Sequence, residues 1–356
     1  MTPSPTEITL ALTPESRIDV INVSDVVAKE KKDFFHVFKK SLFCSYHTTA
    51  GYFEQAFCDR LKNNPDALHA YVGSFRRLFP PEANYRHDQM HLRRELSDAQ
   101  REVEPRNADS HLTYIGAGLE NCVTYKNGSD SPVFFVDLDG LNGDLKRSRK
   151  TTVIGYNSEN IALRDQMDIR MSAHPIDSVN LWDAKYGIIE TLEERVRELG
   201  IQKGRIEMTL DATERNTGLT VNEYETLLMQ HDLVDVLHNP IRFMAQKGRN
   251  MLRDPKAIKE KAKDYAKYDL VHVVNEFIEA MGLSESLIER IIDKFFAVPA
   301  ARFLRMKRSV NLVVSDDQEE GKGRIITGTY QSPILVQWQK AVEGKRAINV
   351  TFKRFE

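Results

Sequence analysis

The chain has 356 residues, more than one typical domain, and its 41% hydrophobic residues are enough to build packed cores. Its 50 basic and 52 acidic residues nearly cancel, so no overall field draws the chain to nucleic acid or to anionic lipid. The three cysteines, Cys44, Cys58 and Cys122, lack the spacing of a zinc knuckle or a redox pair and are typical of a reducing compartment. No basic leader precedes an apolar segment, so we expect a cytoplasmic protein that binds neither nucleic acid nor membrane.

The N-terminal stretch MTPSPTEITLALTPESR, residues 1–17, is predicted to be a short flexible tail. After it, SYHTTAGY (45–52) ends a predicted strand, and FEQAFCDRL then has the pattern of a helix. A strand that stops at a polar cluster commonly presents side chains to a pocket. His47, Thr48 and Thr49 are therefore the first candidate site residues.

Two further polar motifs follow in the same half of the chain, NYRHDQMH (84–91) and RNADSH (106–111). With His47 they supply His87, His91 and His111 as candidate ligands. Three neutral imidazoles that meet at one point bind zinc or a similar cation and leave a fourth position open. Asp88 could then accept the other ring N–H of His87 or join the ligands.

Each histidine also has a plainer interpretation. His47 or His111 taken singly is more often a hydrogen-bonded structural residue than a metal ligand. His87 and His91 are four residues apart, which suits a metal pair on a helix, but the arginines around them suit a solvated turn equally well. Spacing alone leaves metal binding open.

The sequence repeats its pattern of elements. Residues 19–62 and 177–229 show the same order of strand, helix, strand, polar break and helix, and residues 131–155 and 332–354 each show a strand, a basic turn and a closing strand. We therefore predict two diverged copies, at 18–157 and 175–356. A linker at 158–174 joins them, and the second copy carries a helical insertion at about 240–300.

The motifs YHTTAG, YRHD and NADSHL, followed by an apolar strand, DG and basic residues before VIG, resemble the YjbQ family over about residues 18–157. The resemblance implies an α+β fold with an antiparallel sheet and packed helices, assembly into trimers, and a thiamine-phosphate synthase activity. It also implies a metal or anion site at His47, His87 and His111.

The second copy resembles the rest of the family pattern. NTGLTVNE is similar to its HTTAG-x-T-x-NE motif and GTYQ to its GTWQ motif, while Arg215 stands where the first histidine is expected and Arg302 stands near the last. Arginine cannot ligate a metal. The first copy has the histidine motifs, and the second copy has the motifs similar to NE and GTWQ. This division predicts one composite site between the two copies.

The predicted site combines three sets of residues. The metal ligands are His47, His87 and His111, and the candidate catalytic residues are Glu223, Glu54, Gln331 and Thr329. The candidate substrate-binding residues are Thr48, Thr49, Arg86, Asn107, Arg215 and Arg302, since guanidinium groups pair bidentately with phosphate. Alternatively, the second copy is only a scaffold.

The expected function is that of a metal-dependent transferase, hydrolase or lyase that acts on a small phosphorylated or carboxylated substrate, as a homo-oligomer with a divalent metal, zinc by preference. Thiamine-phosphate synthase chemistry follows only from the resemblance, and displacement of pyrophosphate usually recruits magnesium, which prefers oxygen ligands. A metal- or anion-sensing protein without turnover, or a structural oligomeric scaffold, are the alternatives.

Overall fold

The structure is a computed structural model that describes residues 3–81, 85, 87–93, 97–128, 132–173, 177–223 and 306–356. The predicted helical insertion at about 240–300 lies outside the described residues, as do Arg86 and Arg302. Within the described ranges, no helix combines the length and the apolar character that a membrane crossing requires.

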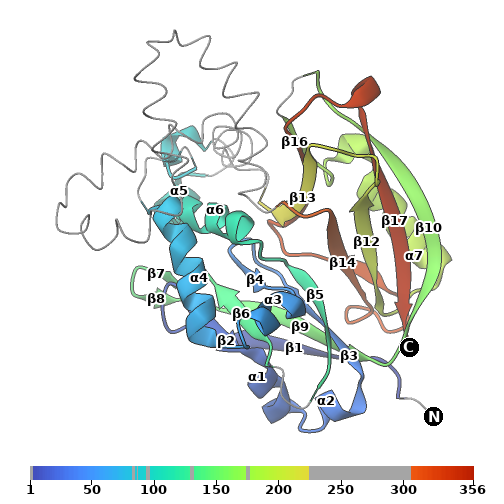
Figure 1. The fold of residues 1–356 in the computed structure, drawn as a ribbon, viewed down its shortest axis with the longest axis horizontal. Coiled ribbons are helices and arrows are strands. Elements are labelled where there is room, and N and C mark those ends of the chain that lie inside the picture. The colour runs from blue at the N-terminus through green and yellow to red at the C-terminus, as the bar shows by residue number, and fades with distance from the viewer. Residues whose placement is uncertain are drawn as a thin grey trace.

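The fold is α+β with antiparallel sheets, as the resemblance implied (Figure 1). In the first half, one sheet has the order β1-β9-β3-β5, a second has the order β2-β6-β4, and β7 and β8 form a short ribbon. The strands of this half are β1 (Thr6–Leu12), β2 (Asp19–Asn22), β3 (Lys40–Ser45), β4 (Ala50–Tyr52), β5 (Cys122–Lys126), β6 (Phe134–Asp137), β7 (Leu141–Asn142), β8 (Leu145–Lys146) and β9 (Arg149–Tyr156). Its helices are α1 (Val23–Glu30), α2 (Phe34–Val37), α3 (Gln55–Arg60), α4 (Pro65–Leu78), η1 (Met90–Leu92), α5 (Asp98–Val103) and α6 (Ala108–Ala117).

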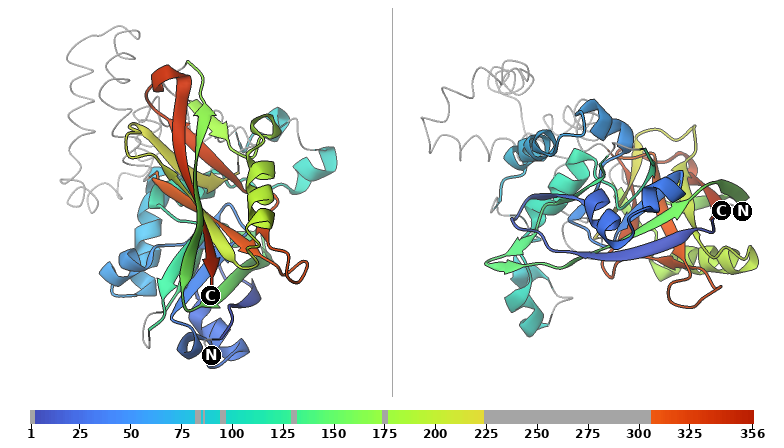
Figure 2. Two further views of the ribbon diagram at one scale, coloured as in Figure 1. Left: turned by 90° about the vertical axis from the view of Figure 1, so that its right-hand side faces the viewer. Right: turned by 90° about the horizontal axis from the view of Figure 1, so that it is seen from below.

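The second half contains a sheet of order β10-β17-β12-β14-β15 and a smaller one of order β11-β16-β13 (Figure 2). Its strands are β10 (Glu159–Arg170), β11 (Asp177–Asn180), β12 (Gly204–Leu210), β13 (Thr217–Asn222), β14 (Ser309–Ser315), β15 (Arg324–Ile326), β16 (Ser332–Gln337) and β17 (Lys345–Phe355). Its described helices are η2 (Ala184–Tyr186), α7 (Ile188–Glu198) and η4 (Val342–Gly344).

The two halves arrange their strands in the same order. β1-β9-β3-β5 corresponds to β10-β17-β12-β14, and β2-β6-β4 corresponds to β11-β16-β13. The registers correspond as well, because Asp137 lies opposite Asp19 in one half and Gln337 lies opposite Asp177 in the other.

Two predicted irregular segments are strands, so the predictions for them were wrong. The supposed tail at 1–17 contains β1, which pairs along β9 and buries Leu10 and Leu12. The supposed linker at 158–174 contains β10, which pairs along β17. β10 is polar because most of its side chains are exposed at a sheet edge, and such a strand resembles a linker in sequence.

The halves pack against each other through shared hydrophobic cores. Ile334 and Val336 of β16 join a core built mainly from the first half. Elsewhere the ring of Phe355 stacks on that of Tyr156, with centroids 3.9 Å apart. The backbone of Gly328 approaches the first half so closely that a Cβ there would lie 1.9 Å from the carbonyl oxygen of Tyr46. This tight packing fixes the position of β13 relative to α6, on which the site depends.

Candidate metal centre

His87, His111 and Glu223 bring their metal-ligating atoms within 4.8 Å of one another. The two imidazole rings are 5.2 Å apart between centroids. The exposed fractions are 0% for His87, 1% for His111 and 8% for Glu223, so the group lies inside the protein. We call this group the His–His–Glu centre.

Three elements supply the centre. His111 lies in the first half of α6, a helix whose residues are all buried. His87 lies just before η1, and Glu223 directly follows β13. The two histidines therefore come from the first half of the chain and the carboxylate from the second.

The ring of His87 is oriented by Asp88. Its Nδ1 lies 2.9 Å from Asp88 Oδ1, which also accepts the backbone N–H of Ala108 at 3.1 Å. A carboxylate oxygen can only accept, so Nδ1 carries the ring proton and Nε2 keeps its lone pair. A carboxylate behind a histidine in this way is the usual support of a metal ligand.

The ring of His111 is oriented by Asn222. The Asn222 amide cannot be reversed, because its Nδ2 donates to the carbonyl of Thr48 at 3.1 Å and its Oδ1 accepts the N–H of Glu223 at 2.8 Å. His111 Nδ1 therefore donates to Oδ1, at 2.8 Å, and the Nε2 lone pair faces Glu223 Oε2 at 3.3 Å. Burial, followed by the neighbouring His87, lowers the pKa of His111 well below its ordinary value, so the imidazole is neutral.

Arg93 lies beside the same centre and is only 2% exposed, so it does not belong to a solvated turn. Its Nη2 lies 3.4 Å from Glu223 Oε1 and its Nη1 lies 3.1 Å from Glu104 Oε1. Nη1 also lies 3.5 Å from Nε2 of His87. The guanidinium thus touches two of the three members of the centre.

His47, predicted as a metal ligand, does not lie in the His–His–Glu centre. Its Nε2 accepts the backbone N–H of Lys150 at 2.8 Å, so that lone pair is occupied. Burial, reinforced by Arg149 and Arg147, lowers the pKa of His47 to about 4. Glu223, and not His47, thus lies beside His87 and His111, while His47 is held against the start of β9.

The other predicted catalytic residues lie outside the centre. Gln331 Nε2 donates to the carbonyls of Ser45 and His47, at 3.0 and 2.9 Å, and so ties β16 to the segment that carries His47. Glu54 pairs with Lys307 at 3.0 Å. Thr329 is exposed.

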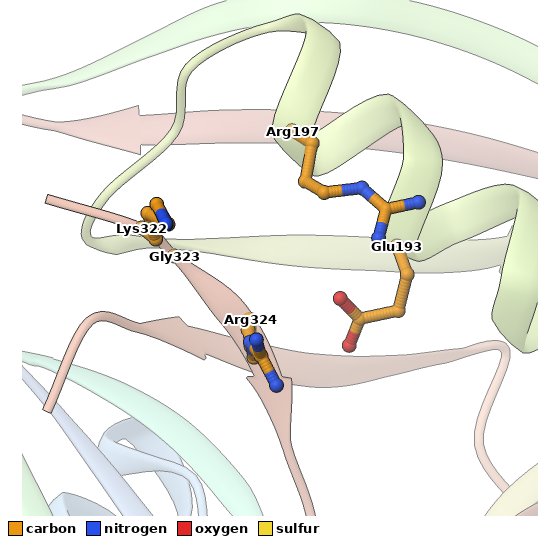
Figure 3. Close-up of a pocket in the computed structure, with 5 residues that line it drawn as sticks. All are labelled: Glu193, Arg197, Lys322, Gly323 and Arg324. Carbon is orange, nitrogen blue, oxygen red and sulfur yellow. The ribbon is translucent and has the colours of Figure 1, made fainter. Parts of the chain in front are cut away.

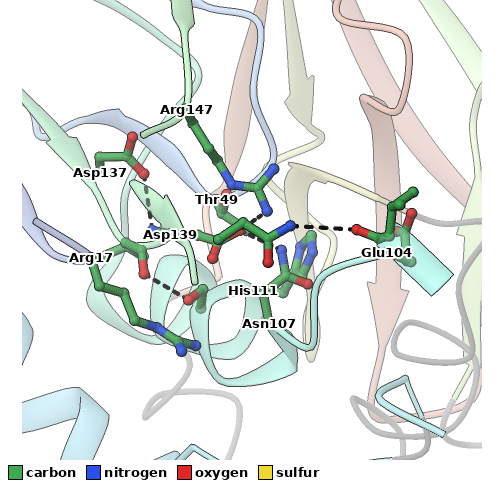
Figure 4. A network of polar contacts seen from close by, with 12 residues as sticks. Arg17, Thr49, Glu104, Asn107, His111, Asp137, Asp139 and Arg147 are labelled. Atoms are coloured by element: carbon green, nitrogen blue, oxygen red, sulfur yellow. Dashed lines mark hydrogen bonds and ion pairs between the residues drawn. The ribbon is translucent and has the colours of Figure 1, made fainter. Parts of the chain in front are cut away.

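Two predicted substrate-binding residues, Thr49 and Asn107, belong to a polar network next to His111 (Figure 4). Asn107 Nδ2 donates to Asp139 Oδ2 at 2.7 Å, and Arg147 Nη2 lies 2.8 Å from the same oxygen. Thr49 Oγ1 accepts a long bond of 3.4 Å from Arg149. Of the remaining two, Thr48 supplies the carbonyl that holds Asn222, and Arg215 is exposed.

Arg93 and Asn222 were not among the site residues predicted from the sequence. Asn222 stands directly before Glu223 in the motif NTGLTVNE, so its place next to a candidate catalytic residue was the available clue. No such clue marks Arg93, which is one of several arginines near His87.

A separate hollow of about 290 Å³ lies between α7 and β15 (Figure 3). Its lining residues are Glu193, Arg197, Lys322, Gly323 and Arg324. None of them belongs to the His–His–Glu centre, so this hollow is not part of the candidate site.

The sequence matches no family profile, and no curated protein matches it. Among solved structures, a YbjQ-like protein of unknown function from Sulfolobus solfataricus is 17% identical, with a TM-score of 0.32 over 55% of this chain and 99% of its own. A hypothetical protein from Aeropyrum pernix is 14% identical, with a TM-score of 0.30 over 53% and 97%. An uncharacterized YjbQ-family protein from Clostridium acetobutylicum is 12% identical, with a TM-score of 0.29 over 53% and 98%. Proteins of the YjbQ family thus stand among the solved structures that are similar to this chain, each over about half of its length.

Proposed function

We propose that the chain binds one divalent metal ion through His87, His111 and Glu223. The observation that carries the proposal is the 3.3 Å contact between His111 Nε2 and Glu223 Oε2. Asn222 accepts from Nδ1 of His111, and burial lowers the pKa of the ring so that it is neutral, which leaves Nε2 without a proton and places two acceptor atoms face to face inside the protein. A cation that both atoms ligate turns this repulsion into attraction.

The donor set favours zinc or a similar transition metal. Two imidazoles and one carboxylate are a common catalytic zinc set, which leaves a fourth position for water or substrate. Magnesium prefers oxygen ligands and keeps its own water, so it suits this centre less well. The supports behind the two rings, Asp88 and Asn222, are of the kind that metal-binding histidines require.

We further propose that the centre serves a transferase, hydrolase or lyase reaction on a small phosphorylated or carboxylated molecule. Such an ion polarises a phosphoryl or carbonyl oxygen or makes a water more acidic. This chain's own residues would hold both imidazoles in the required tautomer and hold Glu223 beside Arg93. The choice of substrate is supported by the motif resemblance to the YjbQ family. A thiamine-phosphate synthase step is less favoured, because the donor set suits magnesium less well than zinc.

The location of the centre supports a second part of the proposal, that the two halves are diverged copies of one unit. The same strand order and matching registers in both halves support common descent. The histidines come from one proposed copy, whereas Asn222 and Glu223 come from the other.

One observation favours an alternative function without turnover. The three members of the centre are at most 8% exposed, and a metal held that deeply can also serve as a sensor or as a structural link between the halves. The two functions differ in whether the metal-loaded protein turns over a substrate.

Titration with zinc in competition with a chromophoric chelator tests metal binding. We expect one zinc per chain, and we expect His87→Ala and His111→Ala each to weaken binding by about a hundredfold or more, since each removes a ligand. His47→Ala is the matched control, because it removes a histidine outside the centre, and it should bind zinc like the unmodified protein. If His47→Ala abolished binding and Glu223→Gln did not, the ligand set predicted from the sequence would replace the one proposed here.

A screen for turnover then separates an enzyme from a binding protein. The zinc-loaded protein is assayed against phosphomonoesters and small carboxylate esters, with His111→Ala as the inactive control. Zinc-dependent turnover that the control lacks supports catalysis. Stoichiometric zinc with no turnover of any compound supports the sensing or structural function.

A further inference from the structure

We propose that Arg93 competes with the metal ion for His87 and thereby sets the affinity of the His–His–Glu centre. This inference rests on the proposed metal site and adds a residue that regulates it. Arg93 is buried and comes from the segment that directly follows His87 in the chain.

The competition follows from the single lone pair on His87. Its Nδ1 donates to Asp88, so Nε2 is the only ring atom that can ligate a metal, and Arg93 Nη1 lies 3.5 Å from that atom. One lone pair cannot bind a guanidinium N–H and a metal ion together. Metal binding therefore requires the contact between Nη1 and Nε2 to break.

The positive charge of Arg93 also opposes the binding of a metal ion. Arg93 is permanently positive, and its Nη2 lies 3.4 Å from Glu223 Oε1. A divalent ion at the centre would lie close to this guanidinium inside the protein, where water screens the repulsion poorly. The contact with Glu223 can persist through Oε1 while Oε2 ligates, whereas the contact with His87 cannot.

Glu104 offers the Arg93 guanidinium a second carboxylate partner. Arg93 Nη1 also lies 3.1 Å from Glu104 Oε1, and the Glu104 side chain is 26% exposed, more than the side chain of any member of the centre. A small movement toward Glu104 would free His87 while the guanidinium kept a carboxylate partner. Among the described contacts, Arg93 thus has a carboxylate partner in the centre and another outside it.

The chemical consequence is a lower affinity for every ion. Only an ion that binds imidazole strongly repays the loss of the Arg93 contact, so zinc should bind measurably and manganese, which lies at the weak end of the divalent series, should bind poorly. Removal of Arg93 should therefore tighten the binding of both metals by a similar factor, because each ion has to displace the same contact.

The experiment measures the dissociation constants of Zn²⁺ and Mn²⁺ for the full chain and three variants by chelator competition, with thermal unfolding as a check of folding. Arg93→Gln removes the charge and should tighten zinc binding and manganese binding by a similar factor, about tenfold or more. Arg93→Lys keeps the charge but cannot fork between Glu104 and the centre, and should tighten zinc binding by a few-fold. Arg101→Gln is the matched control, since Arg101 donates to the backbone carbonyl of Arg93 and to Asp98 but contacts no member of the centre, and it should change affinity less than about twofold.

The outcomes separate this inference from the proposed function. No zinc binding by the unmodified protein or by any variant would overturn the metal site and this inference with it. Zinc binding of equal strength in the unmodified protein and in Arg93→Gln would overturn the inference alone. Weaker binding in both Arg93 variants would also overturn it, because Arg93 would then orient Glu223 rather than compete. If Arg93→Gln failed to fold, the comparison of Arg93→Lys with Arg101→Gln would decide.

Discussion

Asn222 shows how one uncharged side chain sets the chemistry of its neighbours. It is fully buried, its Oδ1 accepts from both His111 and the backbone of Glu223, and its Nδ2 donates to the carbonyl of Thr48. The amide therefore selects the tautomer of His111 and links it to the loop that carries His47. Without this amide, nothing described around His111 Nδ1 would require that atom to be the donor.

We expect Asn222→Ala to destabilise the protein by about 2 to 3 kcal/mol, because it leaves buried hydrogen-bonding groups unpaired. It should also weaken zinc binding by about tenfold or more. Asn222→Asp is the informative partner, since it keeps an acceptor for His111 and should retain most of the zinc affinity. Denaturant unfolding and zinc titration measure the two effects, and an Asn222→Ala protein with unchanged zinc affinity would contradict the role given to the amide.

At the scale of elements, the two halves contact each other where each half has an isolated β-bridge. An isolated bridge joins Tyr52 to Glu120 in the first half, and another joins Leu219 to Lys307 in the second. The side chains of Glu120 and Lys307 pair with each other at 2.8 Å across the contact. Burial raises the pKa of Glu120 to about 7, although Lys307 opposes the rise.

This pKa predicts a pH dependence of stability. The usual value for Glu120 is 4.5, so between about pH 4.5 and 7 the folded protein holds a proton that the unfolded chain has lost. The contribution of Glu120 to stability is therefore fully present below pH 4.5 and is lost as the pH rises through 7. From pH 5 to pH 8, we expect Glu120→Gln to gain about 2 to 3 kcal/mol of unfolding free energy relative to the unmodified protein.

Glu54→Gln is the control for this prediction. Glu54 binds the same Lys307, but its pKa is lowered because Lys307 outweighs the effect of burial. Its own titration lies below pH 5, but the Glu54 carboxylate also raises the pKa of Glu120. Glu54→Gln should therefore gain unfolding free energy relative to the unmodified protein over this interval, by less than Glu120→Gln. A pH-independent difference for Glu120→Gln would show that Glu120 is ionised throughout.

At the scale of the whole molecule, two hydrophobic cores contain residues from both halves. Ile334 and Val336 pack into the core of the first half, and Val313 and Phe355 pack with Leu42 in a further core. The His–His–Glu centre draws on both halves as well. Neither half can lose its structure without exposing apolar surface of the other.

We therefore expect a single calorimetric unfolding transition, with equal calorimetric and van't Hoff enthalpies. Zinc at about 100 times its dissociation constant should stabilise that transition by roughly 2.7 kcal/mol. His87→Ala should show the single transition without the zinc effect. Two transitions, of which only one responds to zinc, would mean that the halves unfold independently.

Features that depend on neighbouring residues were predicted from the sequence more accurately than features that depend on distant residues. The α+β class and the turn from strand to helix after SYHTTAGY depend on neighbouring residues, and the structure has β3, β4 and α3 there. The segments containing β1 and β10 were misassigned because edge strands with solvated faces resemble a tail or a linker. Their assignment as strands depends on partners, β9 and β17, that lie far away in the chain.

By itself, the sequence determined which reactive side chains are available, namely histidines in polar motifs of the first half. It also predicted that the second half repeats the order of elements of the first. Only the tertiary structure decided which atoms meet. His111 and Asn222 are 111 residues apart, and their contact exists because β13 ends beside α6, whereas His47 is drawn to Lys150 by the pairing of β3 with β9. The physical reason is that side-chain patterns encode local backbone geometry and burial, while the convergence of distant groups on one point depends on how whole elements pack.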